Sequence, residues 1–186
     1  MSWTTKVQRS LGFLLGNEGT NPVNRYLTLL GISGLVLWLV VQVVTMTVTF
    51  EVTGVAGITG LVIGMWLLYS LGHRAVGQHM IGKKAVAAKP FLLWSGLILS
   101  AYVVNLSAVF GVGNTDLGQT LMWLPWAAVY ALGYLGTYTL VPERRMYLVG
   151  GVGAIAFIGI ELTATTGGFQ FLVLGILHLV PLVGKD

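Results

Sequence analysis

Cysteine is absent from this 186-residue sequence, and charged residues make up only 9% of it. The lack of cysteine excludes disulfides, thiolate metal sites, cysteine nucleophiles and CxxC redox chemistry. A soluble domain carries roughly 25% charged residues, so this chain has too few to cover a surface that faces water. Hydrophobic residues reach 55%, and the mean hydropathy is +0.84. The composition therefore predicts a chain of single-domain size that folds in lipid.

A cleavable signal peptide is not expected, because residues 1–20 lack a continuous apolar core followed by a small-residue cleavage site. On a helical wheel, Trp3, Val7 and Leu11 share one side of this segment and its basic residues share the other. This pattern predicts an amphipathic helix in the membrane interface, followed by a Gly/Asn-rich hinge. Residues 21–186 are then expected to form the transmembrane domain.

Six long apolar runs follow, and their interiors contain no Lys, Arg or Asp. A membrane core of about 30 Å needs roughly 17–25 helical residues, and backbone groups in lipid must bond within their own segment. The sixth run, with 16 residues, is marginal. The predicted fold class is an all-α polytopic membrane protein, a six-transmembrane-helix bundle with an N-terminal amphipathic interfacial helix. The runs are residues 27–50, 54–72, 91–111, 119–141, 146–166 and 168–183.

The positions of the charges predict the orientation of this bundle. All ten Lys and Arg residues fall on one side of a six-span topology, and the opposite connections carry Glu51, Asp116 and no basic residue. The positive-inside rule makes the basic side cytoplasmic. We therefore expect a multi-pass protein of the plasma membrane with both termini in the cytoplasm, and no nucleic-acid partner despite the net charge of +4.

The connection between the second and third runs is basic, with Arg74, His79, Lys83 and Lys84. Such a loop could bind anionic lipid headgroups or a partner protein. Its role as a topology signal explains the same residues equally well.

Glu161 is the only acidic side chain inside a run, near its outer end. A carboxylate within a membrane is costly and is a candidate functional group, suited to handling protons or cations. Alternatively, it simply reaches the outer interface.

Other polar groups lie in the same outer half of the predicted bundle. Gln42, Thr45 and Thr49 share one helix face, and Tyr102 and Asn105 share another. Together with Glu161, these residues could line a polar cavity for a small solute or ion. The alternative is that they form hydrogen bonds between helices, each of which stabilises a membrane protein by about 0.6–2 kcal/mol.

Four aromatic residues recur at every fourth position of the fourth run: Trp126, Tyr130, Tyr134 and Tyr138. A ridge of this kind could stack against a flat ligand such as a quinone, a carotenoid or haem. Packing between helices explains it as well.

His73 and His178 form a possible pair of axial haem ligands, since both lie toward the cytoplasmic side on different runs. A single pair is a weak signal, so no cofactor is expected and haem b remains only an alternative. No other metal site is expected.

The sequence favours a non-enzymatic membrane protein that binds or passes a small solute or ion. It has no GxxxxGK[ST], HExxH or paired-carboxylate motif, and no run contains a lysine for a retinal Schiff base. The alternatives are an accessory subunit that packs by its glycine-rich faces against a larger membrane complex, and a b-type cytochrome. Expected partners are the lipid bilayer and either further copies of the chain or other membrane subunits.

Overall fold

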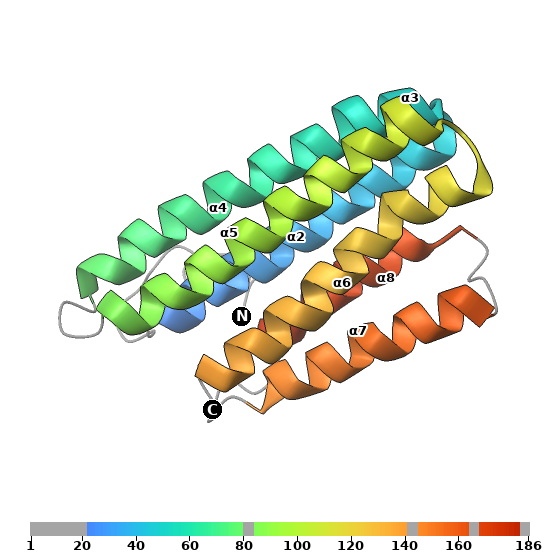
Figure 1. Ribbon diagram of the computed structural model, residues 1–186. Helices are drawn as coiled ribbons and strands as arrows, with labels where there is room; N and C mark the ends of the chain where they lie inside the picture. Colours follow the sequence, from blue (N-terminus) through green and yellow to red (C-terminus); the bar gives the residue numbers. More distant parts are fainter. Residues whose placement is uncertain (1–21, 80–83, 141–144, 164–167, 183–186) are drawn as a thin grey trace, which may run out of the picture.

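The computed structural model describes residues 22–79, 84–140, 145–163 and 168–182, and over these residues every regular element is a helix (Figure 1). The amphipathic helix expected in residues 1–20 lies outside the described residues. Two segments are π-helical, η1 (Thr53–Ile58) and η2 (Ala108–Val112), and η3 (Val180–Leu182) is a 3-10 turn. The α-helices are α2 (Pro22–Thr47), α3 (Phe50–Val52), α4 (Thr59–His79), α5 (Lys84–Ser107), α6 (Asp116–Leu140), α7 (Met146–Thr163) and α8 (Gln170–Leu177).

Four helical stretches in the described part of the chain are long and apolar enough to cross a membrane. They are Thr28–Thr47, Phe50–Gly72, Lys89–Val112 and Met146–Thr163, which correspond to the first, second, third and fifth predicted runs. The second and third stretches extend beyond the predicted bounds, and the second includes the predicted connection at residues 51–53.

The fourth and sixth runs are not among these stretches. α6 has 25 residues and therefore spans about 37 Å, but it is rich in Trp, Tyr and Gly and contains Pro125. α8 has 8 residues, about 12 Å, and is too short to cross a membrane core alone. Four of the six spans thus meet the criteria of length and composition, and the six-span topology stays a prediction.

Successive long helices run in opposite directions between the same two ends of the bundle (Figure 1). α2 packs against α4 and α8, α5 lies between α4 and α6, and α7 packs mainly on α6. The end that contains α3 and the start of α6 is called the α3 end below. Glu51 and Asp116 lie there, whereas Lys89 and Arg145 lie near the starts of α5 and α7 at the opposite end.

The outward faces of the helices are strongly apolar. Large hydrophobic side chains are exposed along α2, α4, α5 and α7, among them Val36, Trp66, Leu92 and Val149. Soluble monomers rarely expose continuous apolar surface on this scale. Apolar surface on this scale, together with the four long apolar helices, suggests a membrane protein.

Glycines bring several helices close together inside the bundle. A Cβ on Gly34 would lie 2.0 Å from His178 Cδ2, and one on Gly150 would lie 2.9 Å from Tyr134 Cδ2. Small residues allow such approaches, which supply packing energy where lipid offers no hydrophobic drive. Other glycines face outward, and Gly60 and Gly159 have no heavy atom within 4 Å of such a Cβ.

Candidate functional site

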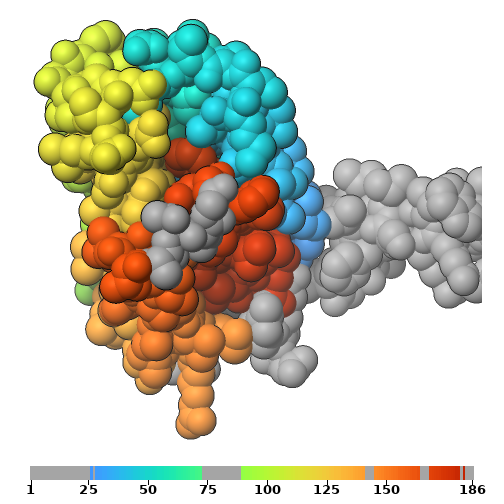
Figure 2. Space-filling view, turned by 90° about the vertical axis from the view of Figure 1, so that its right-hand side faces the viewer, coloured from blue at the N-terminus to red at the C-terminus, as the bar shows by residue number. Residues whose placement is uncertain are grey.

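A cavity of about 950 Å³ lies at the α3 end of the bundle and is called the outer cavity. In Figure 2, which looks onto this end, it lies between the segment around α3, the start of α6 and the red of α8. Its wall is contributed by α2, α3, η1, α6, α7 and α8 and the connections beside them. The lining residues are Thr45, Val48, Thr49, Phe50, Glu51, Thr53, Asn114, Asp116, Gln119, Thr120, Met122, Trp123, Glu161, Leu162, Gly168, Gln170 and Phe171.

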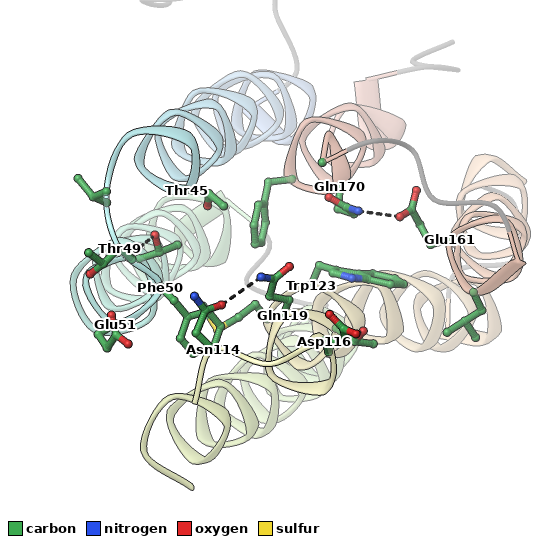
Figure 3. A pocket seen from close by; sticks show the side chains of 17 residues that line it. Thr45, Thr49, Phe50, Glu51, Asn114, Asp116, Gln119, Trp123, Glu161 and Gln170 are labelled. Atoms are coloured by element: carbon green, nitrogen blue, oxygen red, sulfur yellow. Dashed lines mark hydrogen bonds between the residues drawn. The ribbon is translucent and has the colours of Figure 1, made fainter. Parts of the chain in front are cut away.

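Three carboxylates line the outer cavity, and none of the described residues that line it is Lys, Arg or His. Glu51 belongs to α3, Asp116 begins α6, and Glu161 lies near the end of α7. Figure 3 shows them well apart around the cavity. Within the described part of the chain, no group of three or more His, Cys, Asp or Glu side chains could hold a metal ion. The lining is therefore acidic, but its carboxyl groups do not converge on one point.

Glu161 is buried, with only 5% of its surface exposed, and it lines the cavity. Gln170, the first residue of α8, donates a hydrogen bond from Nε2 to Glu161 Oε2 at 2.8 Å (Figure 3). The first turn of a helix carries a partial positive charge, which favours a carboxylate nearby. The start of α8 and the end of α7 together hold this carboxylate at the cavity wall.

The hydroxyl groups of the lining present acceptors to the cavity. Thr45, Thr53 and Thr120 each donate their hydroxyl hydrogen to the carbonyl four residues earlier in the chain, at 2.8, 3.0 and 2.8 Å. A hydroxyl that has given its hydrogen keeps only lone pairs. Carboxylate and hydroxyl oxygens therefore give the wall many acceptors, beside the amide groups of Asn114, Gln119 and Gln170, and such a wall suits a ligand that carries donors or positive charge.

Aromatic rings form the apolar part of the wall. Phe50 lies at the rim, and Trp123 and Phe171 lie deeper, nearly buried. Phe171 stacks on Trp38, with centroids 5.7 Å apart, and Trp38 meets Trp126 edge to face at 5.4 Å. Trp38 and Trp126 are essentially inaccessible. In this structure, the cavity is closed below Phe171 by packed rings.

Three polar residues predicted for a cavity do not line it. Gln42 instead holds the start of α8: its Nε2 donates to the Gly168 carbonyl at 2.8 Å, and its Oε1 accepts the Leu172 N–H at 3.1 Å. The early N–H groups of a helix have no partner within the helix, so this side chain acts as a cap from another helix. The Tyr102 hydroxyl is hydrogen-bonded to Thr59 at 3.0 Å, a link between α5 and α4.

The third is Asn105, which is fully buried and is hydrogen-bonded to α6 where Pro125 interrupts the backbone hydrogen bonds of that helix. Pro125 has no N–H, so the Leu121 carbonyl lacks its usual partner. Asn105 Nδ2 donates to that carbonyl at 2.6 Å and to the Met122 carbonyl at 3.2 Å, while Oδ1 accepts the Trp126 indole N–H at 2.5 Å. All three hydrogen-bond partners of Asn105 lie on α6, so this side chain links α5 to α6.

Tyr130 and Tyr134 of the aromatic ridge lie in the core below the outer cavity. Trp38 Nε1 donates to Tyr130 Oη at 2.6 Å, and the same hydroxyl is 2.5 Å from His178 Nδ1. Tyr134 donates to the Leu177 carbonyl at 2.6 Å. That carbonyl precedes Pro181 by four residues, so the proline has left it without an N–H partner as well.

The His178 side chain, one of the two predicted haem ligands, is hydrogen-bonded within the protein. The Trp38 N–H donates to the Tyr130 hydroxyl, which lies 2.5 Å from Nδ1 of His178, and the tautomer of the imidazole decides which of these two groups donates to the other. The ring is also hydrogen-bonded to the Leu30 backbone. Haem ligation by this residue stays a prediction. The side chain of the proposed second ligand, His73, lies outside the described residues.

The predicted basic loop is outside the described side chains too. Lys83 is not described, and only the backbone is described for Arg74, His79 and Lys84. Lipid or partner binding by this loop stays a prediction.

Of the residues predicted for the outer polar cluster, Thr45, Thr49 and Glu161 line the cavity. Asp116 and Glu51 were identified in the sequence only as loop charges. Gln170 was missed, although it is the only amide side chain in the sixth run.

The described chain is thus all-helical, with four helical stretches that suggest a membrane protein and an acidic cavity at one end. Comparison with protein-family models, with curated proteins and with solved structures finds no match.

Proposed function

We propose that this chain is a multi-pass, non-enzymatic membrane protein of six spans that binds a small cationic solute in the outer cavity. The observation that carries the proposal is the cavity wall, in which three carboxylates and acceptor hydroxyls face a volume of about 950 Å³ and no described lining residue is cationic. A volume of this size suits a small molecule. Opposite charge raises the local concentration of a cation, and low-dielectric walls strengthen the attraction.

The closed floor supports binding rather than open passage. Trp38 and Trp126 block the route from the cavity toward the other end, and Tyr130 and His178 below them are hydrogen-bonded to each other. For a solute to pass through the bundle, α8 would have to move away from α2. Phe171 of α8 stacks on Trp38 of α2, and His178 directly follows α8. Flux of the bound solute in proteoliposomes would extend the proposal to transport.

Equilibrium binding to the purified protein tests the proposal. A panel of inorganic cations and small ammonium compounds is titrated by calorimetry, and at least one should bind. Glu161→Gln keeps the size of the side chain and removes its charge, so it should weaken binding about tenfold, equivalent to about 1.4 kcal/mol. Ser100→Ala removes an exposed hydroxyl of α5 away from the cavity and should change nothing. If no cation binds the unaltered protein, the proposal fails.

The orientation proposed with this function places the outer cavity on the extracellular side and both termini in the cytoplasm. It rests on the segregation of Lys and Arg in the sequence. Because the chain has no cysteine, single cysteines can replace Lys83 and Asp116 without background. An impermeant maleimide added to intact cells should label only the Asp116→Cys protein. Labelling of both positions would overturn the topology.

An accessory subunit of a larger membrane complex remains a second candidate, and the outward-facing glycines favour it. Gly60, Gly96 and Gly159 contact nothing within 4 Å of an added Cβ, on α4, α5 and α7. Small residues at such positions allow another helix to approach closely. A stoichiometric partner that stays bound in mild detergent, and is lost from the Gly96→Leu protein, would support this function. A monodisperse protein without a partner would count against it.

A further inference from the structure

The aromatic part of the outer cavity narrows the class of ligand, and this inference rests on the proposed function. Phe50, Trp123 and Phe171 line the same space as the three carboxylates. An aromatic face attracts a cation, and Trp does so most strongly. Aromatic rings also give a favourable surface to methyl and methylene groups, which bare metal ions do not have. We infer that the ligand is a small organic ammonium compound rather than an inorganic cation.

The spacing of the acidic groups supports the same choice. A divalent cation prefers several oxygen ligands converging at about 2.0–2.6 Å. Glu51, Asp116 and Glu161 stand on three different elements and lie apart around the cavity (Figure 3). No set of three such side chains in the described residues could hold a metal ion. A small organic cation that also carries a hydroxyl group can meet separated oxygen groups at its two ends, whereas a compact ion cannot.

The donor pattern of the wall adds a further restriction. Because the Thr45, Thr53 and Thr120 hydroxyls donate to their own backbone, the wall offers them as acceptors. Gln119 uses one of its two amide hydrogens for Asn114 Oδ1, at 3.0 Å. The side-chain donors of the wall are the amide groups of Asn114, Gln119 and Gln170, and none of the described lining residues offers a cationic donor to an anionic solute. A ligand with a hydroxyl or ammonium hydrogen finds many acceptors.

Choline provides a direct test because 3,3-dimethyl-1-butanol has the same shape without the charge. Both are titrated calorimetrically into the purified full-length protein, beside Na⁺ and Ca²⁺. We expect choline to bind at least tenfold more tightly than the neutral alcohol. We also expect that neither Na⁺ nor Ca²⁺ competes with choline when the concentrations of positive charge are equal. Equal binding of the two isosteres would overturn the inference, because it would show an apolar cavity without charge recognition.

Variants locate the binding. Trp123→Leu should weaken choline binding about tenfold, within the range of a desolvated cation–π contact. Phe50→Leu, at the half-buried rim, tests the same interaction where folding is less at risk. Trp66→Leu removes an exposed Trp of α4 outside the cavity and should leave binding unchanged. Unchanged choline affinity in both the Trp123 and Phe50 variants would refute aromatic recognition.

The outcomes separate this inference from the function on which it rests. If Na⁺ or Ca²⁺ binds in a Glu161-dependent manner and choline does not, the cavity binds cations but the ligand class inferred here is wrong. If neither choline nor any inorganic cation binds, the proposed function fails together with the inference.

Discussion

The link between Asn105 and the proline of α6 gives the sharpest test of how this bundle is held together. Asn105→Ala removes the donor that serves the Leu121 carbonyl and the acceptor that serves the Trp126 N–H. Both partners are then left without a hydrogen bond in the interior. A buried unsatisfied group costs about 1–3 kcal/mol. Two such groups would cost about 2–6 kcal/mol. Single interhelical hydrogen bonds in membranes average only about 0.6 kcal/mol, so we expect the free energy of unfolding to fall by an amount in the lower part of this range, about 2–4 kcal/mol.

Pro125→Ala supplies the backbone N–H that the Leu121 carbonyl lacks, and it makes the cause of this loss testable. In the Pro125→Ala background, Asn105→Ala should orphan only the Trp126 indole and should cost about half as much. The double-mutant cycle should therefore show a coupling of about 1–2 kcal/mol. Ser107→Ala, which removes an exposed hydroxyl bonded to its own helix, serves as the matched control and should be nearly neutral.

Equilibrium unfolding by SDS titration in mixed micelles, followed by circular dichroism, measures these differences. The same cost for Asn105→Ala in both backgrounds would show that the side chain is not there to serve the carbonyl freed by the proline. The account of α6 given above would then be wrong.

Three further changes test other contacts by the same unfolding measurement. Gly34→Ala would place its Cβ 2.0 Å from the His178 ring and should destabilise by about 1–3 kcal/mol, whereas Gly96→Ala, which meets nothing, should be neutral or slightly stabilising. Gln42→Leu removes the cap at the start of α8 and should cost about 1–2 kcal/mol; an unchanged midpoint would deny it that role. Tyr134→Phe leaves one carbonyl of α8 unpaired and should cost about 1 kcal/mol, and an equally stable protein would show that another group replaces the hydroxyl.

The sequence predicted the positions of helices where the composition of a single segment is enough to define them. Continuous apolar runs predicted the four stretches that could cross a membrane, because length and hydropathy are properties of a segment alone. α8 was less predictable. Its apolar pattern continues to residue 183, but Pro181 removes an N–H and the regular helix ends at Leu177.

The partners of polar residues could not be predicted in the same way. Gln42 was recognised as a polar group in an apolar helix, but its partners, Gly168 and Leu172, are 126 and 130 positions away in sequence. Asp116 and Glu51 were assigned to loops, because the position of a charge in the sequence does not show toward which part of the fold its side chain points. Only the packing of the elements around α8 brings these residues to one cavity with Glu161.

The shortness of α8 bears on how the protein is assembled in the cell. A segment of 8 regular residues gains too little from lipid to partition into a membrane independently. Its start is bonded to Gln42 on α2 and the carbonyl at its end to Tyr134 on α6, so its place is defined by helices that are synthesised earlier. α8 is therefore expected to take its place after α2 and α6 have packed, because its contacts with them position it. The Phe171 wall of the outer cavity would be completed only at that step.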